Sequence, residues 1–169
     1  MTEHRKSQSA GVEIVPACDR PQEVGALFAE YTQMLVANDP SFQEYLNLQH
    51  YGEELNHREA KYGPPGGRLY LAYDGGELAG CIGLRRIDAE RCEMKRLYVR
   101  PRFRGRRIGD QLIRRIIEDA RATGYACMLL DTLPFLQSAI RMYRRFGFYE
   151  IPSYNDSPME SSIYMRLDL

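Results

Sequence analysis

The sequence has no apolar run longer than about half a dozen residues, far below the roughly 20 that a membrane-spanning helix requires. Its opening segment, MTEHRKSQSAG, is charged and lacks the apolar stretch of a secretory signal. The four cysteines form no Cys-x-x-Cys pair and have no histidine at metal-ligand spacing. These absences argue against a membrane protein, a disulfide-stapled secreted protein and a zinc protein. They predict a cytoplasmic protein with no metal site.

The composition is that of an ordinary globular domain. Of the 169 residues, 44% are hydrophobic and 27% are charged, which argues against intrinsic disorder. A chain of this length buries a core large enough to fold without disulfides or a metal. The sequence therefore predicts a polar tail at residues 1–10 and one domain over residues 11–169.

The charge is balanced in total but not along the chain. The formal net charge is zero, with 23 basic and 23 acidic residues. Between Asp19 and Tyr62 there are eight acids and three bases, whereas between Cys92 and Arg115 there are nine bases and two acids. The basic block predicts an anionic ligand. The acidic segment has two interpretations, solvated helix faces or a surface that attracts a cation.

The first third of the chain is predicted to be mainly helical. Alternation over 12–16 predicts a strand, and Asp19 ahead of Pro21 predicts the N-cap of a helix. That helix keeps apolar residues at helical spacing as far as Leu35. The other elements predicted here are helices over 42–48 and 53–61 and a loop over 62–67.

The rest of the chain predicts a β-meander followed by alternating helices and strands. Asp74-Gly75-Gly76 is a strong hairpin signal, and Pro101 closes the meander because proline cannot donate to a strand ladder. Gly124 and Gly147 follow two amphipathic helices as left-handed stops. The predicted strands are 68–73, 77–85, 92–99, 126–131, 148–151 and 161–167, and the predicted helices are 106–123 and 136–146. This order predicts the α+β class, as a three-layer α/β/α structure with a mixed sheet.

The most informative segment is 92–109, in which a strand leads through an arginine-rich turn directly into a helix. The first turn of a helix has main-chain N–H groups without intrahelical partners, and the helix dipole makes that end positive. Gly105 and Gly109 allow a ligand to approach the main chain closely. The segment therefore predicts a site for a diphosphate or oligophosphate.

Other interpretations of this segment fit less well. It contains no Gly-x-Gly-x-x-Gly opening a βαβ unit and no Walker pattern. Nonspecific nucleic-acid binding through the arginines lacks a helix-turn-helix and an aromatic platform. Surface charge without a ligand is the remaining alternative.

The same segment resembles motif A of the GCN5-related N-acetyltransferases, whose signature is Arg/Gln-x-x-Gly-x-Gly/Ala at such a junction. Arg104 takes the first position and Gly109 the last. Arg107 stands where the middle glycine is usual. Its side chain can point outward while its amide still serves a phosphate.

Residues 136–148 resemble motif B of that family, with Tyr143 at the usual tyrosine and Gly147-Phe148 closing the helix. Leu136 replaces an asparagine that many relatives carry there, which removes a polar contact to the coenzyme arm. The two motifs and the order of elements extend the resemblance over roughly residues 12–168. It implies the family's strongly twisted mixed sheet flanked by helices.

The resemblance implies acetyl-CoA as the co-substrate. In the family, motif A binds the pyrophosphate, and the preceding strand pairs through its main chain, here at Leu97 and Val99, with the pantetheine arm. One of those amides then faces the thioester carbonyl. The residues implied to contact the coenzyme are Leu97, Tyr98, Val99, Arg104, Gly105, Arg106, Arg107, Ile108, Gly109 and Asp110.

The resemblance also implies an N-acetyltransferase that moves the acetyl group to a primary amine of a small molecule or peptide by direct attack in a ternary complex. Tyr143 is implied as the general acid, the alternative being a core aromatic residue. Glu93 is the candidate base, the alternative being a surface carboxylate paired with Lys95 or Arg91. The other candidate function is a catalytically silent acyl-CoA-binding or nucleic-acid-binding module that uses Arg100–Arg107.

The acceptor is left open among small amines, amino acids, aminoglycosides and protein amines. Asp131 and Thr132 either line the gap between substrate and thioester or are structural. Aromatic residues near acids favour a cationic amine, or else are half-buried packing. These candidates, with one asparagine, are Phe42, Tyr45, Tyr51, Tyr70, Tyr154 and Asn155. We expect no nucleic-acid or membrane partner, and a homodimer is compatible with the resemblance.

Overall fold

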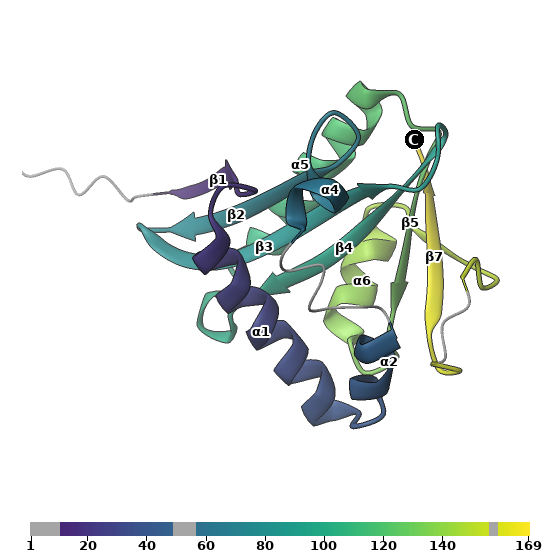
Figure 1. Ribbon diagram of the computed structural model, residues 1–169, viewed down its shortest axis with the longest axis horizontal. Helices are drawn as coiled ribbons and strands as arrows, with labels where there is room; N and C mark the ends of the chain where they lie inside the picture. The colour runs from purple at the N-terminus through teal and green to yellow at the C-terminus, as the bar shows by residue number, and fades with distance from the viewer. Residues whose placement is uncertain (1–10, 49–56, 156–158) are drawn as a thin grey trace, which may run out of the picture.

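A seven-stranded sheet lies between two layers of helices in the computed structural model, which describes residues 11–48, 57–155 and 159–169 (Figure 1). The strands are β1 (Val12–Pro16), β2 (Arg68–Asp74), β3 (Glu77–Arg86), β4 (Arg91–Val99), β5 (Cys127–Thr132), β6 (Tyr149–Ile151) and β7 (Ile163–Asp168). The helices are α1 (Pro21–Asn38), α2 (Phe42–Leu48), α4 (Arg58–Tyr62), α5 (Ile108–Thr123) and α6 (Gln137–Arg145), with a 3-10 turn, η1, at Pro101–Phe103. This confirms the predicted class and layers.

The strand order is β1-β2-β3-β4-β5-β7-β6, and every neighbouring pair is antiparallel except β4 and β5. Figure 1 shows the sheet strongly twisted. The hairpin predicted at Asp74-Gly75-Gly76 is present, and both glycines have the positive φ (61° and 83°) that this tight turn requires.

The predicted N-cap of the first helix was wrong, and the helix predicted from Arg106 begins two residues later. The first helix begins at Pro21 with Arg20 at the N-cap position, and no side chain caps it, so Asp19 is not the N-cap. Proline fixes its own φ at a helical value and therefore sets the first helical position. Helix α5 begins at Ile108 rather than Arg106, because Arg107 has a left-handed φ of 61°.

Other boundaries agree with the predicted ones to within about two residues. The first part of the helix predicted over 53–61 lies outside the described residues, as does the tail predicted at 1–10. Gly124 and Gly147 follow α5 and α6 with left-handed φ values of 98° and 101°. Both stops were predicted.

Hydrophobic clusters on both faces of the sheet hold the layers together. Helices α5 and α6 pack on one face, where Ile113, Ile116 and Met128 are fully buried. Helices α1 and α4 cover the other face through side chains such as Phe28 and Tyr62. Burial on both faces explains why the strands have long buried stretches instead of strict alternation.

The central strand β4 has an irregularity that positions the site. The register of β3 against β4 shifts between Cys81 and Gly83, and Arg96 of β4 has a positive φ of 59°. These features define a β-bulge, which bends the strand. The parallel pairing of β4 with β5 covers Arg91–Glu93 and Cys127–Leu129. Beyond that short ladder the two strands separate.

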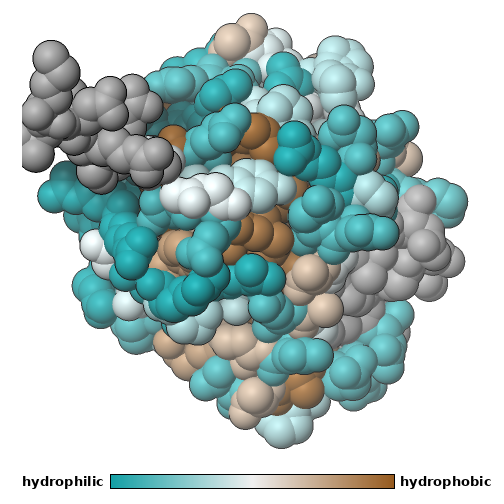
Figure 2. All heavy atoms as spheres, turned by 90° about the vertical axis from the view of Figure 1, so that its left-hand side faces the viewer, coloured by the Kyte–Doolittle hydropathy of each residue, from teal (hydrophilic) through white to brown (hydrophobic). Residues whose placement is uncertain are grey.

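The surface seen in Figure 2 is largely hydrophilic, with some hydrophobic residues showing between polar ones. Among the residues that the structure describes, no helix is long and apolar enough to cross a bilayer. Three cysteines, Cys81, Cys92 and Cys127, are buried free thiols, as predicted. Burial raises the pKa of Cys81 to about 12, so this thiol is unreactive at neutral pH.

Candidate active site

A cleft lies where β4 and β5 separate, and five elements contribute to its walls. Strand β4 provides residues on both sides of the bulge, β5 provides its carboxyl end, and α1, α2 and α6 provide mostly apolar side chains. The lining residues are Tyr31, Leu35, Phe42, Met94, Lys95, Arg96, Leu97, Leu130, Asp131, Thr132, Leu133, Leu136, Tyr143 and Ser162. Six residues singled out from the sequence therefore meet here: Phe42, Leu97, Asp131, Thr132, Leu136 and Tyr143.

The main chain of β4 turns hydrogen-bonding groups toward this cleft. The Arg100 N–H donates to the Ala79 carbonyl of β3 at 2.8 Å. Because main-chain groups alternate in direction along a strand, those of Leu97 and Val99 point away from β3, toward the side of β5. The Val99 carbonyl accepts a hydrogen bond from Arg104 Nε at 3.1 Å. The amide of Leu97 is therefore a main-chain donor on the cleft side of β4.

The arginine-rich turn leads from β4 into α5. Gly105 and Arg107 have left-handed φ values of 82° and 61°, and Arg107 is exposed, as expected for a residue that replaces a glycine. The first intrahelical hydrogen bond runs from Gln111 N–H to the Arg107 carbonyl at 3.2 Å. The N–H groups that precede Gln111 in the helix, those of Gly109 and Asp110 among them, have no carbonyl four residues back within the helix.

Gly109 lies close to the end of the Met142 side chain of α6. A Cβ at Gly109 would lie 3.1 Å from Met142 Cε and 3.2 Å from Met142 Sδ, closer than ordinary van der Waals contact. Asp110 of the same turn is bonded to Arg145 of α6 at 3.1 Å. Met142 directly precedes Tyr143 in α6, so the turn of α5 contacts residues next to the tyrosine.

Tyr143 is the aromatic side chain of α6 that lines the cleft. It is only 7% exposed, and its ring packs against Phe148 with 5.9 Å between centroids. Burial raises the pKa of Tyr143, and the phenol of Tyr31 and the carboxylate of Asp131 raise it further. The phenol therefore keeps its proton throughout the neutral range, which a proton donor requires.

Glu93 lies on β4 before the bulge and is 1% exposed. Its Oε1 accepts a hydrogen bond from Arg85 Nε at 2.7 Å and lies 3.6 Å from Lys95 Nζ, and its Oε2 accepts from the Tyr154 hydroxyl at 2.5 Å. Burial alone would raise the pKa of Glu93, but these two cations and the hydrogen bonds lower it below its ordinary value of 4.5. Glu93 is thus a buried, fully ionised ion-pair partner that is not among the cleft-lining residues.

We expect Glu93→Gln to lower the free energy of unfolding by about 3 kcal/mol near neutral pH, because two cations lose their counter-charge. The folded-state pKa lies below 4.5, so the contribution of Glu93 is complete above that pH and is lost as the pH falls through the lower value. Denaturant unfolding at a series of pH values should show the difference from the wild type narrowing below about pH 4.5. Glu150→Gln, at an exposed position of β6, is the control. A difference that is constant with pH would contradict the ion-pair assignment.

Asp131, Thr132 and Arg96 are further polar residues that line the cleft. Asp131 accepts a hydrogen bond from Asn155 Nδ2 at 3.4 Å. The Thr132 hydroxyl is buried and, among the residues that the structure describes, has no hydrogen-bond partner. Arg96 is 7% exposed and lies over the Phe28 ring at 6.0 Å.

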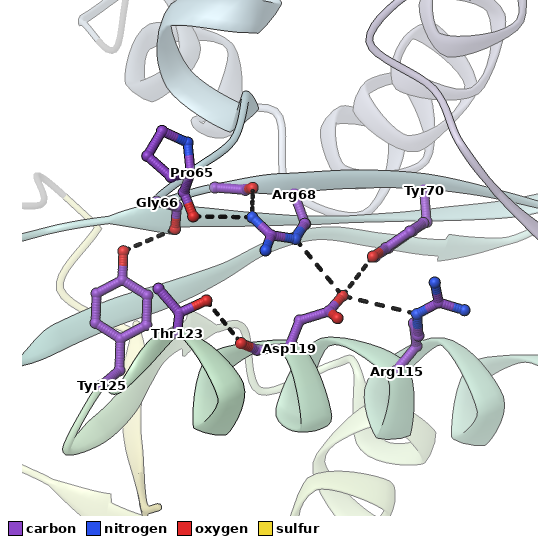
Figure 3. A network of polar contacts seen from close by, with 9 residues as sticks. Pro65, Gly66, Arg68, Tyr70, Arg115, Asp119, Thr123 and Tyr125 are labelled. Carbon is purple, nitrogen blue, oxygen red and sulfur yellow. Dashed lines mark hydrogen bonds and ion pairs between the residues drawn. The ribbon is translucent and has the colours of Figure 1, made fainter.

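The aromatic residues proposed for the acceptor have different locations. Phe42 lines the cleft, and the Tyr154 hydroxyl is bonded to Glu93. Tyr70 instead faces α5, where its hydroxyl donates to Asp119 in the network drawn in Figure 3, so it is packing and not part of the cleft. The side chains of Tyr45 and Tyr51 lie outside the described residues.

The network in Figure 3 joins three parts of the chain on the α5 side of the sheet. Asp119 of α5 lies 3.9 Å from Arg68 Nε and 3.7 Å from Arg115 Nε. Arg68 also donates to the carbonyl of Pro65 at 2.9 Å, which ties the loop before β2 to that helix. This polar cluster is structural, because its charged and polar groups bond to one another and none of them lines the cleft.

Comparison with known proteins agrees with this geometry. The acetyltransferase (GNAT) family model matches residues 29–148. An uncharacterized N-acetyltransferase of Schizosaccharomyces pombe is 40% identical over 126 residues, which are 73% of this chain and 77% of that protein. An acetyltransferase from Streptococcus agalactiae has the same fold, with a TM-score of 0.76, 23% identity, and coverage of 94% of this chain and 99% of that one.

The PaiA N-acetyltransferase of Thermoplasma acidophilum, solved in complex with coenzyme A, also shares the fold, with a TM-score of 0.71 and 16% identity, over 94% of this chain and 99% of that one. The fold is thus that of acyl-CoA N-acyltransferases. The chain belongs to the GNAT acetyltransferase family. It is an acetyl-CoA-dependent acetyltransferase, with acetyl-CoA as its co-substrate.

Proposed function

We propose that the protein acetylates a primary amine held in the cleft between β4 and β5, by direct attack of the amine on the acetyl thioester in a ternary complex. The observation that carries this proposal is the shared location of Tyr143 and the main chain of Leu97 in that cleft. A proton donor and a main-chain N–H donor are the two groups that breakdown of a thioester by an amine requires.

On the coenzyme side, we assign the diphosphate to the main-chain N–H groups of the turn from Arg104 to Asp110, with a charge-assisted contact from Arg104. Arg106 is assigned a second such contact, for which its side chain exchanges Asp74, now at 2.9 Å, for a phosphate oxygen. The main chain of Leu97 and Val99 pairs with the pantetheine arm, with Tyr98 between them. Support comes from the outward direction of these main-chain groups and from the exposed arginine side chains.

Tyr143 is assigned to protonate the leaving thiolate. The nitrogen–carbon bond forms, the carbon–sulfur bond breaks, and the phenol proton passes to sulfur. A thiol has an ordinary pKa of about 8.5, so the thiolate needs a donor that is still protonated at neutral pH. Burial of Tyr143 supports the assignment, because its raised pKa keeps that proton in place.

The base that takes the proton of the amine has two candidates. Glu93 is the candidate from the sequence, and its lowered pKa means that it is ionised at neutral pH. Asp131 is the second candidate, and it is favoured by one observation: it lines the cleft, whereas the oxygens of Glu93 face Arg85, Lys95 and Tyr154.

The binding-module alternative has less support. The Arg100 side chain is paired with Glu30 at 3.0 Å, Arg102 with Glu77 at 3.3 Å, and Arg106 with Asp74 at 2.9 Å. Much of the charge of the basic segment is thus balanced within the chain. This weakens a role as a nucleic-acid surface.

The proposal is tested by thiol release from acetyl-CoA across a panel of amines, amino acids and peptides, with each variant compared at a temperature at which it is folded. If Glu93 is the base, Glu93→Gln lowers kcat by roughly a hundredfold or more and Asp131→Asn lowers it little. The reverse pattern assigns the base to Asp131. The proposed activity would be contradicted by thiol release that occurs without an acceptor. It would also be contradicted if no amine in the panel caused thiol release.

A further inference from the structure

We propose that the acceptor is a primary amine that also carries a carboxylate, such as an amino acid, and that Lys95 binds that carboxylate. The inference rests on the proposed amine acetylation and adds the substrate class. It begins from the position of Lys95, whose side chain is 10% exposed and which lines the same cleft as Tyr143.

The ammonium of Lys95 is incompletely satisfied by the protein. Its nearest carboxylate oxygen, Glu93 Oε1, lies 3.6 Å away, beyond hydrogen-bonding distance, and already accepts from Arg85 at 2.7 Å. The Lys95 ammonium makes no hydrogen bond with any residue in the described part of the chain. A lysine ammonium has three donors, and a buried charge is normally paired and hydrogen-bonded. The site therefore has unused capacity for an anionic oxygen.

The local charge also favours an anion. Glu93 is a single carboxylate between two cations, Arg85 and Lys95, and its other oxygen is held by the Tyr154 hydroxyl. Arg96 adds a second cation to the lining of the cleft. Within the described lining, Asp131 is the one acid. Within the described residues, the acids of the first third of the chain give no carboxylate to the cleft walls.

Lys95 and Asp131 are placed to bind the two ends of one molecule. Glu93 pairs with Leu129 in the parallel ladder, so Lys95 and Asp131 are the next residues on the same face of adjacent strands. The strands separate at this point, which leaves room between the two side chains. An acceptor that places its carboxylate at Lys95 puts its amino group toward Asp131, whose charge is felt at the Tyr143 phenol.

The unpartnered hydroxyl of Thr132 is an independent indication that a polar ligand enters here. It is buried, it lines the cleft, and it has no partner within the described residues. A buried hydroxyl without a hydrogen bond is costly, so it points to a ligand that supplies one. An amino acid has both donors and acceptors to offer at this point.

The experiment compares amino acids with their own carboxamides as acceptors, using thiol release from acetyl-CoA by the full chain. Both members of a pair have a primary amine, so rates are compared at equal concentrations of the neutral amine. For the preferred pair we expect kcat/KM to be roughly 10- to 100-fold higher for the acid, the range of one charge-assisted hydrogen bond. Lys95→Met should reduce the ratio to within about threefold, mainly through KM, and Lys95→Arg should restore most of it.

The matched control is Arg91→Gln, which removes an exposed cation from the same strand outside the cleft and should leave the ratio unchanged. The inference would be overturned, with amine acetylation left intact, if carboxamides and acids gave equal kcat/KM. A preference for the acid that persists in Lys95→Met would have the same consequence.

If no amino acid causes thiol release from acetyl-CoA, calorimetric titration of the same amino acids into the chain saturated with coenzyme A distinguishes failure of amine acetylation from failure of carboxylate binding at Lys95. Binding that Lys95→Met abolishes supports the inference and contradicts the activity. No binding of any carboxylate-bearing amine overturns the inference as well.

Discussion

Replacing Tyr143 by phenylalanine is expected to lower kcat for acetyl transfer by roughly 10²- to 10³-fold, within the range of a positioned general acid. The phenyl ring keeps the packing against Phe148, so the change removes the hydroxyl and little else. The dissociation constant of acetyl-CoA should change by less than about threefold, because the phenol acts on the leaving sulfur and not on the diphosphate. Stopped-flow thiol release and calorimetric titration measure the two quantities separately.

The matched control is Tyr149→Phe, which removes an exposed tyrosine hydroxyl that is bonded to Asp168 at 2.9 Å, away from the cleft. It should leave kcat unchanged. A Tyr143→Phe enzyme with normal turnover would remove this phenol from the mechanism. If both variants are destabilised equally, a loss of kcat in Tyr143→Phe alone cannot be attributed to stability.

Reversal of charge at Arg104 is the second large effect that we expect. Arg104→Glu should weaken acetyl-CoA binding by roughly 10- to 100-fold, since a charge-assisted contact to phosphate is lost and a repulsion is added. The loss should shrink at higher ionic strength, because the side chain is exposed and its interactions are screened. Titration of acetyl-CoA at low and high salt measures both effects.

Arg102→Glu is the control for this experiment. Arg102 lies two residues earlier, is exposed, and is paired with Glu77, so the same change of charge is made outside the assigned coenzyme contacts. Equal weakening by both variants would show a general field of the basic segment instead of a specific contact at Arg104. Unchanged affinity in Arg104→Glu would place the diphosphate elsewhere.

Much of the fold followed from local patterns in the sequence. The Asp-Gly-Gly turn between β2 and β3 and the glycine stops after α5 and α6 depend on φ values that few other residues adopt, so neighbouring residues are enough to predict them. The N-cap was misplaced because two local signals competed, and the fixed φ of Pro21 outweighed the side chain of Asp19. The β4 bulge at Arg96 was not predicted, because it depends on pairing with β3.

The candidate site could be predicted where a motif carries it and not where tertiary contacts decide. The motif pointed to Tyr143, and the structure places that residue in the cleft. The sequence also weighed Glu93 as an ion-pair partner of Lys95, and that contact is present. Its stronger partners come from β3 and from the loop after β6, which strand patterns cannot bring together in advance. No pattern in the sequence indicated that Lys95 lines the cleft, and this residue was named only as an ion-pair partner of Glu93.

The contact between Gly109 and Met142 has a mechanical consequence. The end of the Met142 side chain lies against Gly109 at the amino end of α5, and the ion pair of Asp110 with Arg145 links the same ends of α5 and α6. A coenzyme whose diphosphate binds at the α5 turn would thus be positioned relative to Tyr143, which follows Met142 in α6. A displacement of either helix should therefore change coenzyme binding and proton transfer together.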